Sequence, residues 1–240
     1  MGEKDQNSVA AIQISISSVA AYVAYIGIGL AIGIIAIILV GRQFGPTFGY
    51  FGSEALLYAA AVFAHFRFAY GVSNWPRLEK GDITRTVLWA LFLVIVGFYA
   101  ISGVGRVWAQ RFQGVDDSIH LRPEESVRSY SRYISGFPAI ILVGINVCIV
   151  APIAEEIIFR SGLYRILKGK MSVASAAIVS SLVFAITHRS AVAVAPLFLL
   201  GFLSCWIYEK TTDIRGPMIF HAGYNFLVCL PALVRMSQTA

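Results

Sequence analysis

Long apolar stretches separated by short polar connections dominate the chain. Seven such stretches can be drawn: Val19–Val40, Ala55–Ala64 with an extension towards Tyr70, Val87–Val104, Phe137–Ala154, Val173–Thr187, Ala191–Tyr208 and Met218–Val234. A helix needs roughly 20 apolar residues to cross the ~30 Å hydrocarbon core of a bilayer, with about 17 as a lower limit. The first stretch is comfortably long, whereas the second and fifth are short. The pattern therefore predicts an all-α, polytopic transmembrane helical bundle of about seven helices, within a range of six to eight.

Composition and charge agree with a membrane protein. Only 13% of the 240 residues are charged and 58% are hydrophobic, whereas a soluble domain carries about 25% charged residues. The net charge of +6 does not indicate nucleic acid, because the cations lie between the apolar stretches, as expected beside anionic lipid. We therefore expect membrane lipids and no nucleic acid as partners, and a multi-pass protein of the cell inner (plasma) membrane.

Two adjacent carboxylates and an arginine stand at the end of the fourth apolar stretch. Ionised groups in or beside hydrocarbon cost several kcal/mol unless they are paired or face water, so they usually mark function. Glu156 and Arg160 are four residues apart with the acid N-terminal, the favourable arrangement for an ion pair on one helix face. Glu155 lies about 100° round the helix from Glu156. Its side chain can therefore point elsewhere and take part in chemistry.

Two histidines lie on later predicted helices. Phe184-x-x-x-His188 closes an apolar run, and His221-x-x-x-Asn225 places two polar side chains on one face of the last helix. Each histidine alone also fits a packing role, and the amide of Asn225 alone fits a hydrogen bond to a neighbouring helix.

The spacing of Glu155 and His188 predicts that they meet. They are 33 residues apart, and the midpoint falls in residues 168–172, a natural turn. Two antiparallel helices of equal path length would place both side chains at the same depth. His221 fits this layer less obviously. By the 100° step, Asn146 lies on the opposite face from Glu155 and is expected to bond a neighbouring helix, while His65 is expected to anchor at the membrane interface.

Two carboxylates, two imidazoles and an amide are sufficient for hydrolysis. A base can activate water, an imidazole can orient the water or donate a proton, and N–H groups can bind the oxyanion. The three groupings, in this order on late helices, resemble the motifs of the CPBP family of intramembrane proteases (CAAX protease and bacteriocin-processing, also called ABI). The resemblance covers about residues 138–231. One departure is visible: the glycine that often follows the arginine directly is displaced, because Ser161 precedes Gly162.

The resemblance implies an intramembrane endopeptidase that uses glutamate-activated water. In the family's proposed mechanism, one glutamate activates the water with the help of a histidine, two N–H donors stabilise the oxyanion, and an ion pair holds the geometry. The residues in these roles would be Glu155 with His188, then His221 with Asn225, and then Glu156 with Arg160. The chain would divide into a polar tail (1–18), N-terminal helices with an interfacial loop (19–136) and a catalytic core (137–240).

The sequence leaves alternatives open for the cofactor, the substrate and the activity. A zinc site needs three protein ligands and a water, and Glu155, His188 and His221 could supply them, but the metal-free mechanism is favoured. The expected partner is a membrane-embedded or lipid-anchored peptide or protein. The first alternative is a catalytically silent membrane scaffold or immunity-type regulator of the same family. The second is a proton-coupled transporter that uses Glu155 and His188 as a relay.

Overall fold

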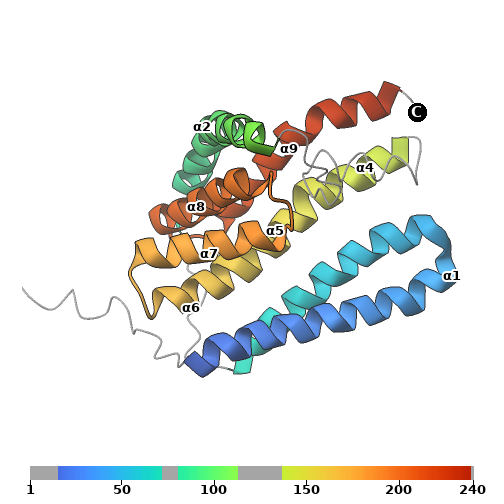
Figure 1. The fold of residues 1–240 in the computed structure, drawn as a ribbon, viewed down its shortest axis with the longest axis horizontal. Helices are drawn as coiled ribbons and strands as arrows, with labels where there is room; N and C mark the ends of the chain where they lie inside the picture. The colour runs from blue at the N-terminus through green and yellow to red at the C-terminus, as the bar shows by residue number, and fades with distance from the viewer. Residues whose placement is uncertain (1–15, 72–80, 113–136, 239–240) are drawn as a thin grey trace, which may run out of the picture.

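The computed structural model describes residues 16–71, 81–112 and 137–238, and these residues form helices joined by short turns (Figure 1). The helices, in chain order, are α1 (Ile16–Gly71), α2 (Ile83–Ala109), η1 (Gln110–Phe112), α4 (Phe137–Ile145), η2 (Asn146–Val150), α5 (Ala151–Glu156), η3 (Ile157–Tyr164), α6 (Arg165–Lys168), α7 (Val173–Thr187), α8 (Val194–Thr211) and α9 (Arg215–Gln238). The predicted all-α class is confirmed. Most of the predicted polar tail and of the interfacial loop lies outside the described residues.

The N-terminal helix α1 folds back on itself. Tyr22 and His65 would lie about 65 Å apart in a straight helix, yet the Tyr22 hydroxyl is 3.1 Å from Nδ1 of His65. Figure 1 shows the resulting pair of antiparallel arms, here called the hairpin. The arms approach closely at Gly29, because a Cβ atom there would lie only 2.7 Å from the carbonyl oxygen of Ala60. The first two predicted apolar stretches are these two arms.

Helices α4, η2, α5, η3 and α6 follow one another without a break from Phe137 to Lys168. This continuous element is here called the motif helix. Two of its sections, η2 and η3, are π-helical. Pro152 lies just after η2 and has no N–H to donate to the preceding turn, which accounts for the wider turn at that point. Short π-helical sections of this kind occur frequently at functional sites.

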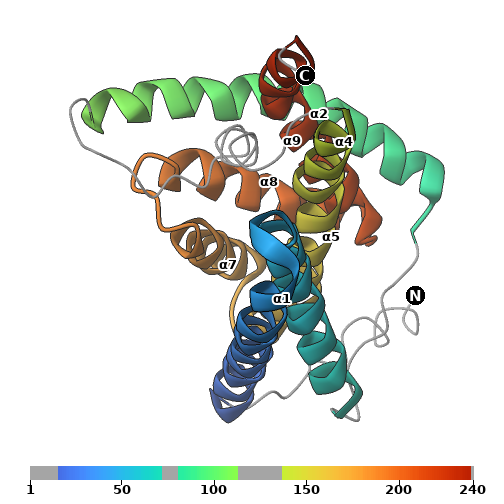
Figure 2. The ribbon, with the colours of Figure 1, turned by 90° about the vertical axis from the view of Figure 1, so that its right-hand side faces the viewer.

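Helix α7 begins after the predicted turn at residues 168–172 and covers Val173–Thr187, the same residues as the fifth predicted stretch. The Ser172 side chain accepts a hydrogen bond from the Ser175 N–H at 3.1 Å and caps the helix. Helix α7 then runs antiparallel to the motif helix, as expected (Figure 1). Helices α8 and α9 pack together and are covered by α2, which lies on the opposite side of the molecule from the hairpin (Figure 2).

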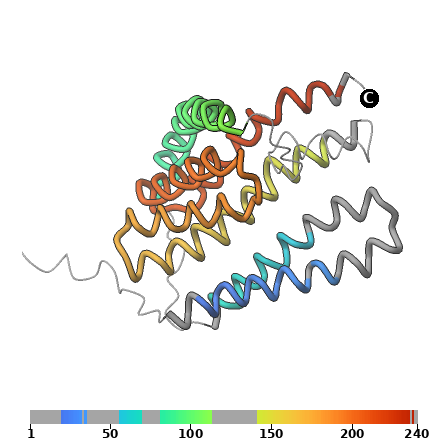
Figure 3. Tube along the Cα trace, in the orientation of Figure 1, coloured from blue at the N-terminus to red at the C-terminus, as the bar shows by residue number. Residues whose placement is uncertain are grey.

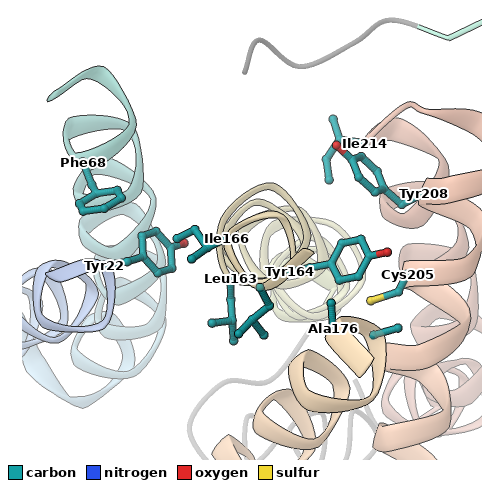
Figure 4. Packing of buried hydrophobic residues seen from close by; sticks show 11 residues of the cluster. Tyr22, Phe68, Leu163, Tyr164, Ile166, Ala176, Cys205, Tyr208 and Ile214 are labelled. Atoms are coloured by element: carbon teal, nitrogen blue, oxygen red, sulfur yellow. The ribbon is translucent and has the colours of Figure 1, made fainter. Parts of the chain in front are cut away.

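The motif helix is central and packs on both sides. Figure 4 shows Tyr22 of the hairpin pointing towards it from one side, while Tyr164 of the motif helix points away towards α8. Both tyrosines are almost fully buried. Catalytic side chains on this helix would therefore be held rigidly by neighbours from both halves of the chain.

The exterior is suited to lipid. Three described helical stretches are long and apolar enough to cross a membrane: Ile83–Phe112, Ile141–Lys168 and Arg215–Arg235. Three shorter apolar helices are Ala20–Ile32, Leu56–Ala69 and Val173–Thr187. Large apolar side chains such as Leu88, Val107 and Phe63 point outwards. These features are those of a helical membrane bundle.

Candidate active site

A cavity of about 410 Å³ lies between the hairpin, the motif helix, α7 and α9. Its wall is largely apolar and contains a few polar side chains. These polar residues are Tyr58, Asn146, Glu155, Thr187, His188, His221 and Asn225. Four of the six expected site residues thus line one cavity, and the other two, Glu156 and Arg160, are buried behind it.

Glu155 presents its carboxylate to the cavity and has different neighbours at its two oxygens. The hydroxyl of Tyr58 donates a hydrogen bond to Oε1 at 3.0 Å. Nε2 of His221 is 3.8 Å from Oε2. The side chain is 13% exposed, so the carboxylate is shielded from bulk solvent while water can still reach it.

Glu156 points away from the cavity and is fully buried. Its Oε2 lies 3.0 Å from Nε of Arg160, so the pair expected from the four-residue spacing is present. Its Oε1 accepts a hydrogen bond from Nδ1 of His221 at 2.8 Å. The buried carboxylate thus has an ion-pair partner at one oxygen and a hydrogen-bond partner at the other. Glu156 therefore links the motif helix to α9.

Arg160 and Phe184 fill the space behind the site. A guanidinium N–H of Arg160 donates to the carbonyl of Gly201 at 3.1 Å, and the guanidinium carbon lies 4.8 Å from the centre of the Phe184 ring. The same ring packs against His188 at 4.8 Å and His221 at 5.8 Å between centroids. Phe184 thus separates and orients both imidazoles.

His188 ends helix α7 and lines the cavity. Its Nδ1 is 2.9 Å from the carbonyl oxygen of Phe184. Because a carbonyl can only accept, Nδ1 carries the proton, and in the neutral ring Nε2 is then an acceptor. Glu155 and His188 line the same cavity, as the antiparallel arrangement predicted.

His221 and Asn225 lie one turn apart on α9, on the face that meets the motif helix. Asn225 donates from Nδ2 to the carbonyl of Val147 at 3.0 Å. Val147 lies in η2, where the π-helical turn makes its carbonyl available. His221, whose depth the sequence left unresolved, lies between the carboxylates of Glu155 and Glu156.

Two expectations about other polar residues were wrong. Asn146 lines the cavity together with Glu155, because the wider π turn between them breaks the 100° step of the α-helix. His65 is not exposed as an anchor to the membrane would be but is buried within the protein, with its ring nitrogens 3.1 Å from the Tyr22 hydroxyl and 3.3 Å from the Ser161 hydroxyl. Sequence reasoning also missed Tyr58, which reaches the site only through the fold of the hairpin.

Ser161, which stands where the family often has a glycine, and the following Gly162 both contact the hairpin. Ser161 contacts His65, and a Cβ atom at Gly162 would lie only 1.8 Å from the Tyr22 hydroxyl oxygen. That hydroxyl also donates to the carbonyl of Ile158 at 2.8 Å. Ser161 and Gly162 are therefore the place where the hairpin docks onto the motif helix.

The residues present do not fit a metal centre well. In the described part of the chain, no group of three or more His, Cys, Asp or Glu side chains is placed to hold a metal ion. Because Nδ1 of His221 is hydrogen-bonded to Oε1 of Glu156, only Nε2 of this ring could ligate a metal ion, and it lies 3.8 Å from Oε2 of Glu155. The residues that could supply an alternative zinc site, Glu155, His188 and His221, would have to move together to bind one ion.

The C-terminal half of the chain is similar to known membrane peptidases. The sequence profile of the Type II CAAX prenyl endopeptidase Rce1-like family matches residues 137–227, which include all six expected site residues. The match covers less than half of the chain and is consistent with the resemblance of these residues to the CPBP family. The chain is 29% identical over 161 residues to the protein named "Putative membrane peptidase YdiL" from Bacillus subtilis. It is 28% identical over 173 residues to the UPF0177 protein YbdI from Lactococcus lactis.

The extent of these matches differs between the two relatives. The match to YdiL covers 65% of this chain and 60% of the relative, so the chain spans less than two thirds of that protein. The match to YbdI covers 70% of this chain and 82% of the relative. No solved structure matches this chain. The hairpin arm that carries Tyr58 lies outside the profile match.

Proposed function

We propose that the protein is an intramembrane endopeptidase that hydrolyses a peptide bond of a membrane-embedded or lipid-anchored peptide or protein. The observation that supports this is the convergence of Glu155, His188, His221 and Asn225, from three elements, on one largely apolar cavity. An apolar wall suits a peptide segment that arrives from the bilayer, and the polar side chains suit the hydrolysis of its backbone. The proposed location is the cell inner (plasma) membrane, with several helices crossing it.

In this proposal Glu155 is the general base. It takes a proton from a water molecule as the water oxygen attacks the carbonyl carbon, and the proton passes to the leaving amine. His188 accepts a hydrogen bond from the same water at Nε2, because its Nδ1–H donates to the carbonyl of Phe184. General-base catalysis of this kind typically contributes ~10²–10⁴-fold. The mechanism as proposed uses no metal.

His221 and Asn225 would stabilise the oxyanion. Nδ2 of Asn225 has two N–H groups, and one of them donates to Val147, which fixes the direction of the other. His221 donates to Glu156 from Nδ1, so it can donate from Nε2 only when the ring carries both protons. Donors held in a site of low dielectric stabilise developing negative charge strongly.

Glu155→Gln tests the proposal. The amide keeps the shape of the side chain but cannot accept the proton of the water near neutral pH, so cleavage should be lost while the protein still folds. The measurement is comparative mass spectrometry of membrane peptides from cells that carry the natural protein, the variant or neither. Glu209→Gln is the matched control, because Glu209 pairs with Lys168 and does not line the cavity.

The outcomes separate the three classes of function. Retention of more than a tenth of the natural turnover in Glu155→Gln would remove Glu155 from the role of base. A cellular function that survives this substitution with no cleavage product in any strain would favour the silent scaffold or immunity-type regulator. A flux that depends on the pH gradient and is lost with Glu155 would favour the transporter.

A further inference from the structure

The hairpin contributes one polar side chain directly to the candidate base. The hydroxyl of Tyr58 donates to Oε1 of Glu155 at 3.0 Å across 97 residues of sequence, and Tyr58 also lines the cavity. This hydrogen bond connects the N-terminal half of the chain to the carboxylate of Glu155. Tyr58 lies outside the region matched by the family profile, so the motif residues alone do not give it a role.

A second contact between the hairpin and the motif helix, that of His65 with Ser161, fixes the placement of Tyr58. Tyr58 and His65 are seven residues apart on the second hairpin arm, and their partners Glu155 and Ser161 are six residues apart on the motif helix. Both separations correspond to about 10 Å along a helix axis. The second arm and the motif helix therefore run in the same direction and in register, as the traces in Figure 3 show.

The contact between the hairpin and the motif helix at Gly162 also fixes the position of the hairpin along the helix axis. The Tyr22 hydroxyl occupies the space that a side chain at Gly162 would need, and it donates to the carbonyl of Ile158. A shift of the hairpin by one residue would drive this tyrosine into the motif helix and move the Tyr58 hydroxyl by about 1.5 Å along the axis. The packing around Gly162 thus sets the distance between Tyr58 and Glu155.

A hydrogen bond to one oxygen of a carboxylate determines how its plane is oriented. With Oε1 held by the Tyr58 hydroxyl, Oε2 is the oxygen directed towards Nε2 of His221, at 3.8 Å. A hydrogen bond to a charged acceptor is stronger than one between neutral groups. Without it, the carboxylate could rotate about its last side-chain bond and present either oxygen to the cavity.

We propose that Tyr58 is a positioning residue, whose hydroxyl holds Oε1 of Glu155 so that Oε2 faces the water that it activates. This inference rests on the proposed function for its catalytic consequence, but the contact itself does not. The hairpin thereby completes the site that the motif residues form. A protein that retains all six motif residues but lacks the hairpin hydroxyl would have an imprecisely placed base.

Infrared difference spectroscopy tests the contact without a substrate. The band of the Glu155 carboxylate is identified as the band that disappears in Glu155→Gln. Tyr58→Phe removes only the hydroxyl, and we expect it to shift this band, because the carboxylate loses a donor. Tyr25→Phe is the matched control, since Tyr25 lies on the same hairpin with its side chain 44% exposed. An unchanged Glu155 band in a folded Tyr58→Phe protein would overturn the inference.

Kinetics with a cleavable peptide test the consequence. Tyr58→Phe should lower kcat by about 10- to 100-fold, as expected for a misplaced catalytic group, with KM and the melting temperature unchanged, because the ring still fills its place in the wall. Equal turnover in Tyr58→Phe and the natural protein would remove the positioning role. If no protein cleaves any peptide, the proposed function fails, while the infrared result still decides whether Tyr58 holds Glu155.

Discussion

Nδ1 of His221 lies 2.8 Å from Oε1 of Glu156, although 65 residues separate them in sequence. The other carboxylate oxygen of Glu156 faces Arg160 at 3.0 Å. Glu156 is therefore shared between a local partner on its own helix and a distant partner on α9. A change at any of these three residues should affect the other two, because all of them are buried.

Arg160→Ala should lower both stability and activity. The substitution leaves the buried carboxylate of Glu156 without its cationic partner, and breaking a buried pair in this way costs about 3–5 kcal/mol. The measurement is thermal unfolding of the purified protein in detergent. Replacing both partners, Glu156→Gln with Arg160→Gln, should recover part of the lost melting temperature, because no unpaired charge remains buried.

The pair between Lys168 and Glu209 is the control for this prediction. Its side chains are 35% and 29% exposed, so Lys168→Ala should cost at most about 1 kcal/mol, as for exposed pairs in general. If Arg160→Ala and the double variant melt at the same temperature, the buried pair does not contribute in the manner argued.

His221→Ala and Asn225→Ala should each slow turnover by up to ~10²–10³-fold with little change in KM, if both donate to the oxyanion. Their combined effect should be less than the product of the single effects, because both act on one oxygen. Steady-state kinetics of the two single variants and the double variant measure this. Fully multiplicative effects would indicate two independent roles, such as proton transfer by His221 and structural support of Val147 by Asn225.

The helices and the ion pair of Glu156 with Arg160 could be predicted from the sequence, because they depend on residues that are close together in the chain. Apolar length predicted the helices, Lys168–Ser172 predicted the turn, and the four-residue spacing predicted the contact of Glu156 with Arg160. The antiparallel arrangement of the motif helix and α7, with equal path lengths from the turn, is enough to bring Glu155 and His188 to one cavity. Helix geometry alone determines these features.

The remaining features depend on distant parts of the chain. The 100° step of an α-helix predicts the wrong face for Asn146, because η2 is π-helical. His65 and Tyr58 lie in an apolar arm with no motif around them, and only the docking of the hairpin brings them to the motif helix. The contact of His221 with Glu156 likewise depends on how α9 packs.

Metal removal should leave activity intact. In the proposed mechanism Glu155 activates water directly, so purified protein treated with a chelator should cleave at the untreated rate, and zinc should not copurify at near-unit stoichiometry. Elemental analysis and an activity assay before and after chelation measure both. Near-stoichiometric zinc that disappears in His188→Ala and His221→Ala would overturn the metal-free mechanism and make these histidines ligands.

Gly162→Ala should destabilise the protein and loosen the hairpin. The added methyl group would lie 1.8 Å from the oxygen and 2.4 Å from the ring carbon Cζ of Tyr22, distances that side chains do not tolerate, so Tyr22 must move away from the motif helix. Overpacking of this kind typically costs about 1–3 kcal/mol. Gly144→Ala on the same helix is the matched control, because a Cβ atom added there would meet nothing within 4 Å, and alanine favours a helix by up to about 1 kcal/mol over glycine. Thermal unfolding should therefore show a lower melting temperature for Gly162→Ala and no lowering for Gly144→Ala.

Because the hairpin carries Tyr58, Gly162→Ala should also lower kcat below the value for Gly144→Ala at temperatures where both are folded. Equal melting temperatures for the two variants would mean that the hairpin does not dock at Gly162.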